Sequence, residues 1–331
     1  MYFSVIIPTY NPREYLPELL TSLTRNECVK EIEVVLSDDC SEESFDDIID
    51  SFKVLNIKTI QNDKHYGFPR NGRENGAKVA TGKWICFTDQ DDYYVDNAFD
   101  KIKSYIEQNN IQNYFTSNFI RHVADTDEYT LYDGFCGWTH GKFYEKSFWD
   151  KYELGYDNLQ YCEDVNLSTK TGCVLTSNYL EVKKMEEPVY IWNRRADSLS
   201  SDINSYFPKS MPDYVKGTIG VIIDYIEDHI YNKDVCDALT LKFIQTIYHI
   251  YFYCQNQNIF NDKKAILATA VEIQPIYDRF KKATDIDTNK ILERTTTDLM
   301  GFYAQTRAED YNQVTFFEEI TFRDWLHTYI E

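Results

Sequence analysis

Several features that define whole classes of proteins are missing from this sequence. No apolar run approaches the ~20 residues that span a bilayer, so we expect peripheral membrane contact at most. The eight cysteines never form a C-x-x-C pair and the six histidines are not clustered, which argues against a zinc site and for reduced thiols. Met1–Pro8 has neither a basic leader nor a cleavage site. These absences indicate a cytoplasmic protein, or one at the inner face of the membrane.

Basic residues, glycine and proline are also scarce. Against 54 Asp and Glu residues stand 34 Lys and Arg residues, which gives a formal charge of −20. This balance disfavours a protein that grips phosphate backbones, because each such contact needs Lys or Arg, and it suits one that recruits cations. Only 12 Gly and 8 Pro are present and 43% of the residues are hydrophobic, which is typical of a globular chain. A length of 331 residues predicts one large domain, or a domain with an appendage.

The first hundred residues alternate between strand and helix patterns. Short runs rich in β-branched residues predict strands, and apolar residues at helical spacing predict helices. This alternation predicts an α/β domain of three layers, α/β/α, with a mixed, mainly parallel sheet. The predicted strands are Tyr2–Ile7, Glu31–Leu36, Lys58–Gln61 and Lys83–Phe87, and the predicted helices are Arg13–Thr24, Ser44–Leu55 with Ser44 as N-cap, and Pro69–Ala80.

The last third of the sequence has a different character. Beyond Gly220 only Gly301 and Pro275 remain, and apolar residues recur at helical spacing. We therefore predict a helical carboxyl-terminal region that starts near Tyr206. Its apolar stripes are Leu239, Phe243, Ile247, Ile250 and Cys254, and Ile219, Ile222, Ile223, Ile226 and Ile230.

Polar and acidic residues follow the predicted strands at their carboxyl ends. The first strand leads into Pro8-Thr9-Tyr10-Asn11, the second into Ser37-Asp38-Asp39-Cys40-Ser41 and the fourth into Thr88-Asp89-Gln90-Asp91-Asp92. In open α/β sheets these ends meet at one edge, where ligands bind. The carboxylates of Asp89-Gln90-Asp91 suit a hard divalent cation, and Asp39 suits a ribose hydroxyl or a base imino group. Each motif taken alone also fits a solvated turn, and Tyr10 suits either base stacking or packing.

In combination, these segments resemble the family 2 glycosyltransferases, inverting enzymes with the GT-A nucleotide-diphospho-sugar fold. The resemblance covers roughly residues 1–201, and the nearest general likeness is to bacterial surface-polymer enzymes such as the wall teichoic acid GlcNAc transferases. It implies a GT-A domain at 1–205, with a nucleotide-binding half at 1–100 and an acceptor half at 101–205, and a helical domain at 206–331. The further segments that carry it are Phe68–Gly72, Gly137–Tyr144, Tyr161–Leu167 and Tyr190–Arg194.

The resemblance also implies roles for individual residues. Asp164 is the implied general base that deprotonates the acceptor hydroxyl, and Glu163 the residue that orients the acceptor. Asp91 is the implied ligand of a Mn²⁺ or Mg²⁺ ion that bridges the donor diphosphate. The implied donor-binding residues are Pro8, Thr9, Tyr10, Asp39, Arg70, Asn71, Asp89, Gln90, Arg194, Arg195 and Ser198, and the implied acceptor residues are Trp138 and His140.

Two positions depart from the common pattern of the family, and two others have a plainer interpretation. Cys40 stands where the family often has glycine, which puts the local turn geometry in question because cysteine lacks glycine's freedom at positive φ. Gln90 is bulkier than the usual residue between the two aspartates. Trp138 is also consistent with a residue that packs in the core. His140 is also consistent with a structural histidine that is hydrogen-bonded in a loop.

The activity that the resemblance implies is an inverting, metal-dependent hexosyl- or N-acetylhexosaminyl transfer. The implied donor is a nucleoside diphosphate sugar, with UDP as the expected nucleotide, and the implied acceptor is a hydroxyl of a surface glycan, teichoic-type polymer or lipid-linked oligosaccharide. Transfer to a modified base in nucleic acid is an alternative that the charge of −20 disfavours. A nucleotidyltransferase is a second alternative, but it would need a glycine-rich loop after the first strand, and Pro8-Thr9-Tyr10-Asn11 is not such a loop. A non-catalytic glycan-binding relic is a third, but it would not need all the acidic groups. The helical region is a candidate for acceptor binding, homo-oligomer formation or membrane docking.

Overall fold

The computed structural model describes residues 1–195, 203–257, 259–284 and 322–330. Two compact units divide the chain, one formed by Met1–Tyr156 with Glu181–Ser198 and the other by Asp157–Leu180 with Leu199–Glu331. The segment with Glu163 and Asp164 thus belongs to the second unit, although the sequence suggested a domain of residues 1–205. The domain limits predicted from the sequence stay a prediction.

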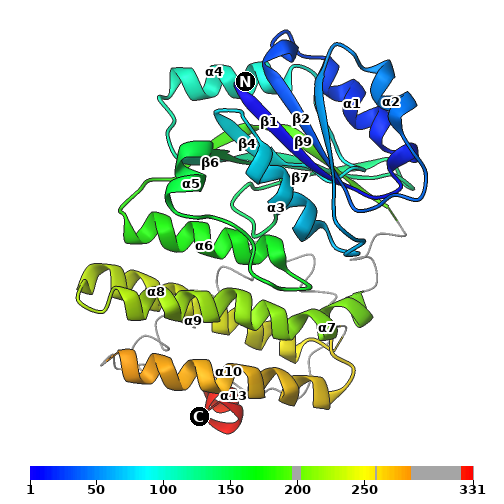
Figure 1. Ribbon diagram of the computed structural model, residues 1–331. Helices are drawn as coiled ribbons and strands as arrows, with labels where there is room; N and C mark the ends of the chain where they lie inside the picture. The colour runs from blue at the N-terminus through cyan, green and yellow to red at the C-terminus, as the bar shows by residue number, and fades with distance from the viewer. Residues whose placement is uncertain (196–202, 258, 285–321, 331) are drawn as a thin grey trace. The chain divides into compact units, whose positions relative to one another are not determined.

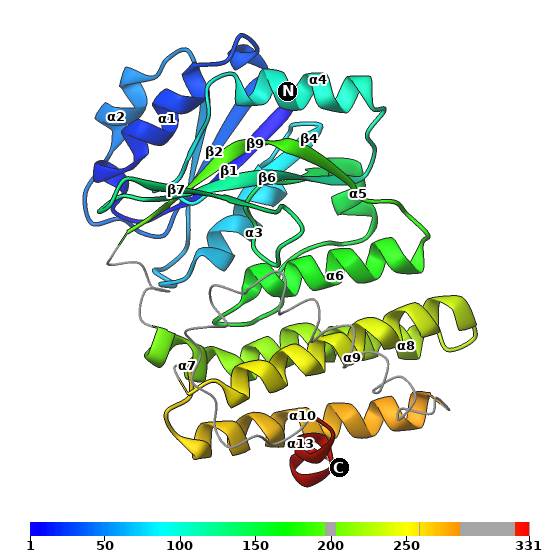
Figure 2. The same ribbon diagram turned by 180° about the vertical axis from the view of Figure 1, so that it is seen from behind.

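A nine-stranded sheet forms the centre of the first unit (Figures 1 and 2). Its order is β3-β2-β1-β4-β8-β6-β9-β5, with β7 paired to β6. The first four of these strands are parallel, which confirms the predicted mixed, mainly parallel α/β sheet. The strands are β1 (Phe3–Thr9), β2 (Ile32–Asp38), β3 (Asn56–Gln61), β4 (Trp84–Phe87), β5 (Tyr93–Tyr94), β6 (Tyr114–Val123), β7 (Glu128–Tyr132), β8 (Lys142–Glu145) and β9 (Lys183–Arg194).

Helices cover both faces of this sheet. Helices α1 (Leu16–Thr24), α2 (Asp46–Ser51) and α4 (Ala98–Gln108) lie on one face and α3 (Pro69–Val79) on the other (Figure 1); a short helix, α5 (Lys146–Lys151), follows β8. Helix α3 approaches the sheet closely through Gly72 and Gly76, where a Cβ atom would lie 2.8 Å from Pro8 Cβ and 2.3 Å from Ile6 Cγ2. This close packing holds the first turn of α3 against the end of β1.

A buried carboxylate connects β1 and β2 to the turn before β4. Glu33 of β2 is 4% exposed; it accepts hydrogen bonds from Ser4 Oγ, from Thr81 N at 2.8 Å and from Thr81 Oγ1 at 2.9 Å. Burial raises the pKa of Glu33, but these donors outweigh burial and hold the pKa below its usual value. The charged form of Glu33 therefore stabilises the folded state.

We expect Glu33→Ala to lower the free energy of unfolding at pH 7 by ~1–3 kcal/mol, because the buried donors of Ser4 and Thr81 lose their acceptor. A carboxyl group whose pKa is depressed by folding stabilises the protein above the unfolded pKa of ~4.3, and this contribution disappears as the pH falls through the folded pKa. Urea titrations of both proteins should show the difference at pH 7 shrinking in acid. A difference that stays constant down to pH 3 would contradict the role given to the charge.

The second unit is helical, as the carboxyl-terminal sequence predicts. Its core includes the predicted apolar stripe Leu239, Phe243, Ile247, Ile250 and Cys254, which lies on α9 (Lys233–Gln255). Within the described residues, no helix is long and apolar enough to cross a membrane. The helices are α6 (Glu163–Ser177), α7 (Ile203–Val215), the π-helical segment η3 (Lys216–Gly220), α8 (Val221–Asp228), α9 (Lys233–Gln255), α10 (Lys263–Ala283) and α13 (Phe322–Tyr329).

Two details of the predicted helices are wrong. The second helix spans Asp46–Ser51 instead of Ser44–Leu55, and its N-cap position is Phe45. Ser44 instead forms a local turn in which its hydroxyl accepts from Asp46 N at 3.2 Å, a common competitor of helix capping. Ile230 lies beyond the end of α8 and is 47% exposed, so the apolar stripe ends at Ile226.

Candidate active site

The carboxyl ends of β1, β2 and β4 bring three predicted loops together. Thr9 pairs with Asp38 in the parallel register of β1 and β2. Asp39 N donates to Thr9 O at 2.8 Å, and Thr88 N donates to Ile6 O at 3.0 Å. The loops that follow Pro8 and Thr9, Asp38 and Thr88 therefore open at one edge of the sheet.

Asp39 organises the loop that follows β3. Its carboxylate accepts from Asn62 Nδ2 at 2.7 Å, from Tyr66 N at 2.9 Å and from Gly67 N at 2.8 Å. The ring of His65, in the same loop, lies against Tyr10, with the ring centroids 4.4 Å apart. The sequence reasoning missed this loop, because its residues converge on Asp39 only through the fold.

Tyr10 is the exposed aromatic residue of this edge. The residue is 36% exposed, and its hydroxyl donates to Glu42 at 3.2 Å. The backbone of Tyr10 is held by Gln90, which accepts from Tyr10 N at 2.8 Å and donates to Tyr10 O at 3.0 Å. The amide of Gln90 therefore connects the loop after β4 to the loop after β1. This contact gives the long side chain at position 90 a structural role.

Cys40 adopts the backbone conformation that the family pattern assigns to glycine. Its φ is +65°, in the left-handed region that non-glycine residues rarely enter. The Cys40 thiol lies 3.4 Å from Asn62 O, so that it also contacts the loop beside Asp39. The turn keeps its glycine-like geometry although a cysteine occupies it.

Arg73 is the partner of Asp89. Its Nη2 donates to Asp89 Oδ1 at 2.6 Å, and the side chain of Arg73 is 4% exposed whereas that of Asp89 is 36% exposed. Burial raises the pKa of Asp89, but the charge of Arg73 outweighs burial and holds the pKa below its usual value. Arg73 was not predicted; the signal for it is its place in α3 beside Gly72 and Gly76, the residues that face the sheet.

Asp91, the predicted metal ligand, pairs with Arg195. Arg195 Nη2 lies 2.7 Å and Nε 3.0 Å from Asp91 Oδ2, and the same guanidinium lies over the ring of Tyr15, 4.2 Å from its centroid. Burial and the charge of Asp89 raise the pKa of Asp91, and Arg195 opposes them. Burial and the neighbouring carboxylate therefore disfavour the charged form of Asp91 although a guanidinium lies beside it.

His140 and Trp138 belong to an aromatic cluster. His140 is buried and stacks on Tyr190 and Trp192, with centroids 5.1 and 5.4 Å away. Trp138 packs on Trp192 at 5.4 Å. Burial lowers the pKa of His140 to about 4, so the ring is neutral at neutral pH. For Trp138 these contacts agree with the packing interpretation. His140 packs in the same way, but its buried Nδ1 has no hydrogen-bond partner in the part of the chain that the structure describes, which differs from the hydrogen-bonded loop histidine that the sequence suggested. The acceptor role of both residues stays a prediction.

Asp92 was also missed as a structural residue of this edge. It is buried and accepts from the hydroxyl of Tyr190 and from Asn193 N at 2.8 Å. Both partners belong to β9, which ends at Arg194. Asp92 therefore fixes the loop after β4 against the strand that leads to Arg194 and Arg195.

The remaining predicted residues lie in both units. Arg70 and Asn71 occupy the first turn of α3, where Arg70 Nη2 donates to Asn71 Oδ1 at 3.2 Å. Glu163 and Asp164 begin α6 in the second unit, and Asp164 Oδ1 accepts from Val165 N at 2.7 Å. Ser198 lies outside the described residues.

The acidic loop after β4 suits a divalent cation whose other ligands are phosphate oxygens or water. Among the described residues, no three His, Cys, Asp or Glu side chains are grouped to hold a metal ion by themselves. Mg²⁺ and similar hard cations are commonly held by one or two carboxylates with substrate phosphates and water. Asp91, which is 21% exposed and has a raised pKa, has the chemistry and the charge environment for one such ligand.

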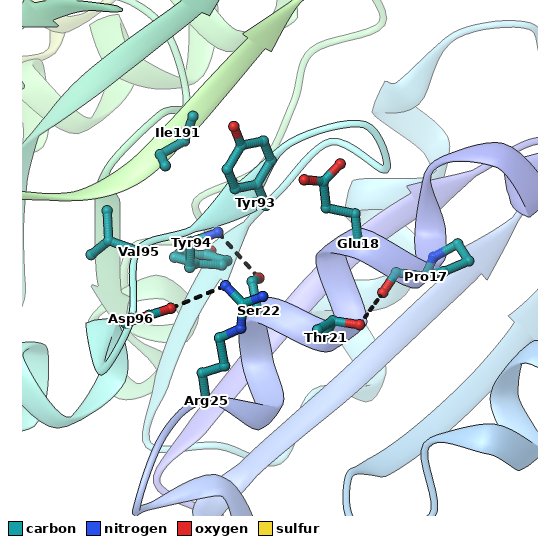
Figure 3. A pocket seen from close by; sticks show the side chains of 10 residues that line it. All are labelled: Pro17, Glu18, Thr21, Ser22, Arg25, Tyr93, Tyr94, Val95, Asp96 and Ile191. Atoms are coloured by element: carbon teal, nitrogen blue, oxygen red, sulfur yellow. Dashed lines mark hydrogen bonds and ion pairs between the residues drawn. The ribbon is translucent and has the colours of Figure 1, made fainter.

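A hollow of about 390 Å³ lies beside α1 at the β5 edge of the sheet (Figure 3). Its polar groups bind one another: Thr21 Oγ1 donates to Pro17 O at 2.7 Å, and Arg25 pairs with Asp96 at 3.1 Å. The lining differs from the predicted donor-site residues and consists of Pro17, Glu18, Thr21, Ser22, Arg25, Tyr93, Tyr94, Val95, Asp96 and Ile191. We assign no ligand to this hollow.

The mixed sheet with acidic loops at its carboxyl edge, followed by a helical region, defines a GT-A-like fold. The crystal structure titled S. aureus TarS 1-349 in complex with UDP-GlcNAc has this fold: it aligns with a TM-score of 0.56 at 18% identity, over 86% of this chain and 88% of that chain. Residues 4–160 match the family model Glycosyl transferase family 2. This segment, just under half of the chain, is therefore similar to the glycosyl transferase family 2 domains.

Curated relatives match about a third of the chain. Poly(ribitol-phosphate) beta-N-acetylglucosaminyltransferase TarS of Staphylococcus aureus is 37% identical over 110 residues, which are 33% of this chain and 19% of TarS. A poly(ribitol-phosphate) beta-glucosyltransferase of Bacillus spizizenii is 32% identical over 112 residues, 33% of this chain and 18% of the relative. The match thus spans about a fifth of the length of these two relatives.

Proposed function

We propose that this protein is an inverting, metal-dependent glycosyltransferase that moves a sugar from a UDP-linked donor to a hydroxyl group of a surface polymer. The observation that carries the proposal is the convergence of Tyr10, Asp39, Asp89 and Asp91 at one sheet edge within a segment similar to the family 2 domains. The names of the relatives suggest N-acetylglucosamine or glucose as the sugar and poly(ribitol phosphate) as the acceptor. A cytoplasmic location is part of this proposal.

Each part of the site has a task in this reaction. Asp39, with the Tyr10 ring beside it, would receive the nucleotide, and Arg70 suits the diphosphate because its planar fork pairs with two oxygens at once. A Mn²⁺ or Mg²⁺ ion held through Asp91 would supply positive charge for the leaving diphosphate.

Asp164 would act on the acceptor. Its carboxylate takes the proton from the acceptor hydroxyl, whose oxygen forms a bond to the anomeric carbon. The bond between that carbon and the diphosphate oxygen breaks, and UDP leaves with the electron pair. Attack from the face opposite the leaving group inverts the anomeric centre.

A screen of nucleotide sugars tests the donor. We expect UDP-GlcNAc or UDP-glucose with MnCl₂ to raise the melting temperature, and GDP-mannose to leave it unchanged. At 100 times its dissociation constant, a ligand adds ~2.7 kcal/mol of stability, which a thermal-shift assay resolves. Stabilisation by GDP-mannose but by neither UDP-sugar would contradict the proposed donor.

A further inference from the structure

A loop in the second unit leads to Glu163 and Asp164, and α7 binds it. Asp213 of α7 accepts two consecutive backbone N–H groups through one carboxylate oxygen: Gln160 N at 2.7 Å and Tyr161 N at 2.9 Å. The ring of Tyr161 also meets Tyr206 of α7 edge-on, with the centroids 5.5 Å apart. The turn that precedes the acidic pair is therefore held by a helix about 50 residues further along the chain.

A second set of bonds connects the start of α6 to η3. Asn166 is fully buried; its Nδ2 donates to Asp157 Oδ2 at 2.8 Å and to Gly217 O at 3.2 Å, and its Oδ1 accepts from Asp157 N at 3.0 Å. Lys170, one turn along α6, pairs with the same Asp157 at 2.6 Å. One amide side chain thus connects the loop, the first turn of α6 and η3.

The backbone at this junction is tightly constrained. Cys162, the N-cap residue of α6, has φ +55°, a conformation that non-glycine residues adopt only when their surroundings impose it. Gly217 lies so close to α6 that a Cβ atom would be 2.7 Å from Leu159 Cδ1 and 3.1 Å from Asn166 Cβ. It belongs to a π-helical segment, a feature frequent at functional sites.

We propose that Asp213 and Asn166, together with Gly217 of η3, are positioning residues. They fix the orientation of the Glu163 and Asp164 side chains at the start of α6. The inference rests on the proposed function of Asp164 as the base. A base must reach the proton that it abstracts within hydrogen-bond distance, and a displacement of about 1 Å can lower a rate about 100-fold. The carboxyl-terminal helices thereby take part in catalysis by orienting the acidic pair.

Asp213→Ala tests the first contact. We expect kcat for release of UDP from UDP-GlcNAc, with water as the acceptor, to fall about 10- to 100-fold, with unchanged donor KM and unchanged UDP affinity in calorimetry. Asp213→Asn keeps one oxygen that can accept both N–H groups, and should restore most of kcat. Asp262→Ala is the matched control, since Asp262 caps α10 by accepting from Lys264 N at 2.8 Å; it should lower the melting temperature and leave kcat unchanged.

A pair of glycine variants in η3 tests the second contact. Gly217→Ala should lower kcat because its Cβ displaces Asn166, whereas Gly220→Ala, whose Cβ would lie 3.8 Å from Ile276 Cδ1 in ordinary contact, should keep it. Full kcat in both Asp213→Ala and Gly217→Ala would overturn the inference. So would an equal loss of kcat in Asp262→Ala, because activity would then follow stability.

The same assay separates this inference from the proposed function. Loss of kcat in Asp164→Asn with full kcat in Asp213→Ala and Gly217→Ala removes the positioning role and leaves the base in place. Full kcat in Asp164→Asn removes the base assignment, and the positioning role with it.

Discussion

Replacement of Asp164 by asparagine is expected to lower the rate of sugar transfer by ~10²–10⁴-fold, the usual contribution of a general base. Asparagine has nearly the same shape and keeps an oxygen for the bond from Val165 N, which Asp164 accepts at 2.7 Å. The variant should therefore fold normally and lose only the ability to take a proton. Its affinity for UDP, measured by calorimetry, should be unchanged, because the predicted nucleotide contacts lie on other residues.

Asp234→Asn is the matched control for Asp164→Asn. Asp234 lies in the first turn of α9 in the same unit, so its replacement removes one negative charge from the same position relative to a helix. A carboxylate at such a position stabilises a helix by ~0.3–1 kcal/mol, and both variants should lose about this much. The assignment of Asp164 as the base is wrong if Asp164→Asn transfers sugar as fast as Asp234→Asn.

The first unit could be predicted well because its local patterns and its topology agree. β1, β2, β3 and β4 form close to the predicted ranges, since each is a short run of β-branched and apolar residues joined to the next by a helix. The antiparallel pairing of β8 with β4 and β6 could not be predicted in this way, because register between distant segments leaves no local signal.

The acidic loops were predictable, whereas their partners were not. Asp39, Asp89 and Asp91 follow strands, and strand order alone places them at one edge. The partners Arg73 and Arg195 approach from α3 and from the end of β9, and Asp213 reaches its loop from α7. These ion pairs and hydrogen bonds depend on how helices and strands pack, and a glycine spacing such as Gly72 and Gly76 is the strongest hint of that in the sequence.

The second large effect is expected from the replacement of Asp91, and the charges around this residue are the reason. Asp91 lies beside Asp89, and in the structure its positive partner is Arg195. Asp89 pairs with the buried Arg73 at 2.6 Å and its pKa is lowered, whereas the pKa of Asp91 is raised. A cation near the diphosphate would therefore depend more on Asp91, which is the basis for choosing it over Asp89 as the ligand to remove.

We expect Asp91→Asn to lower Mn²⁺-dependent release of UDP from UDP-GlcNAc by ~100-fold or more, because Lewis-acid stabilisation is worth several kcal/mol and each 1.4 kcal/mol is a factor of ten. The gain in melting temperature that MnCl₂ adds to UDP should vanish as well. Asp96→Asn removes the same charge from an exposed pair with Arg25, 3.1 Å away, and should keep both properties. If Asp91→Asn keeps the full Mn²⁺ effect, Asp91 is not the metal ligand. Asp89, whose carboxylate is more exposed, then becomes the candidate.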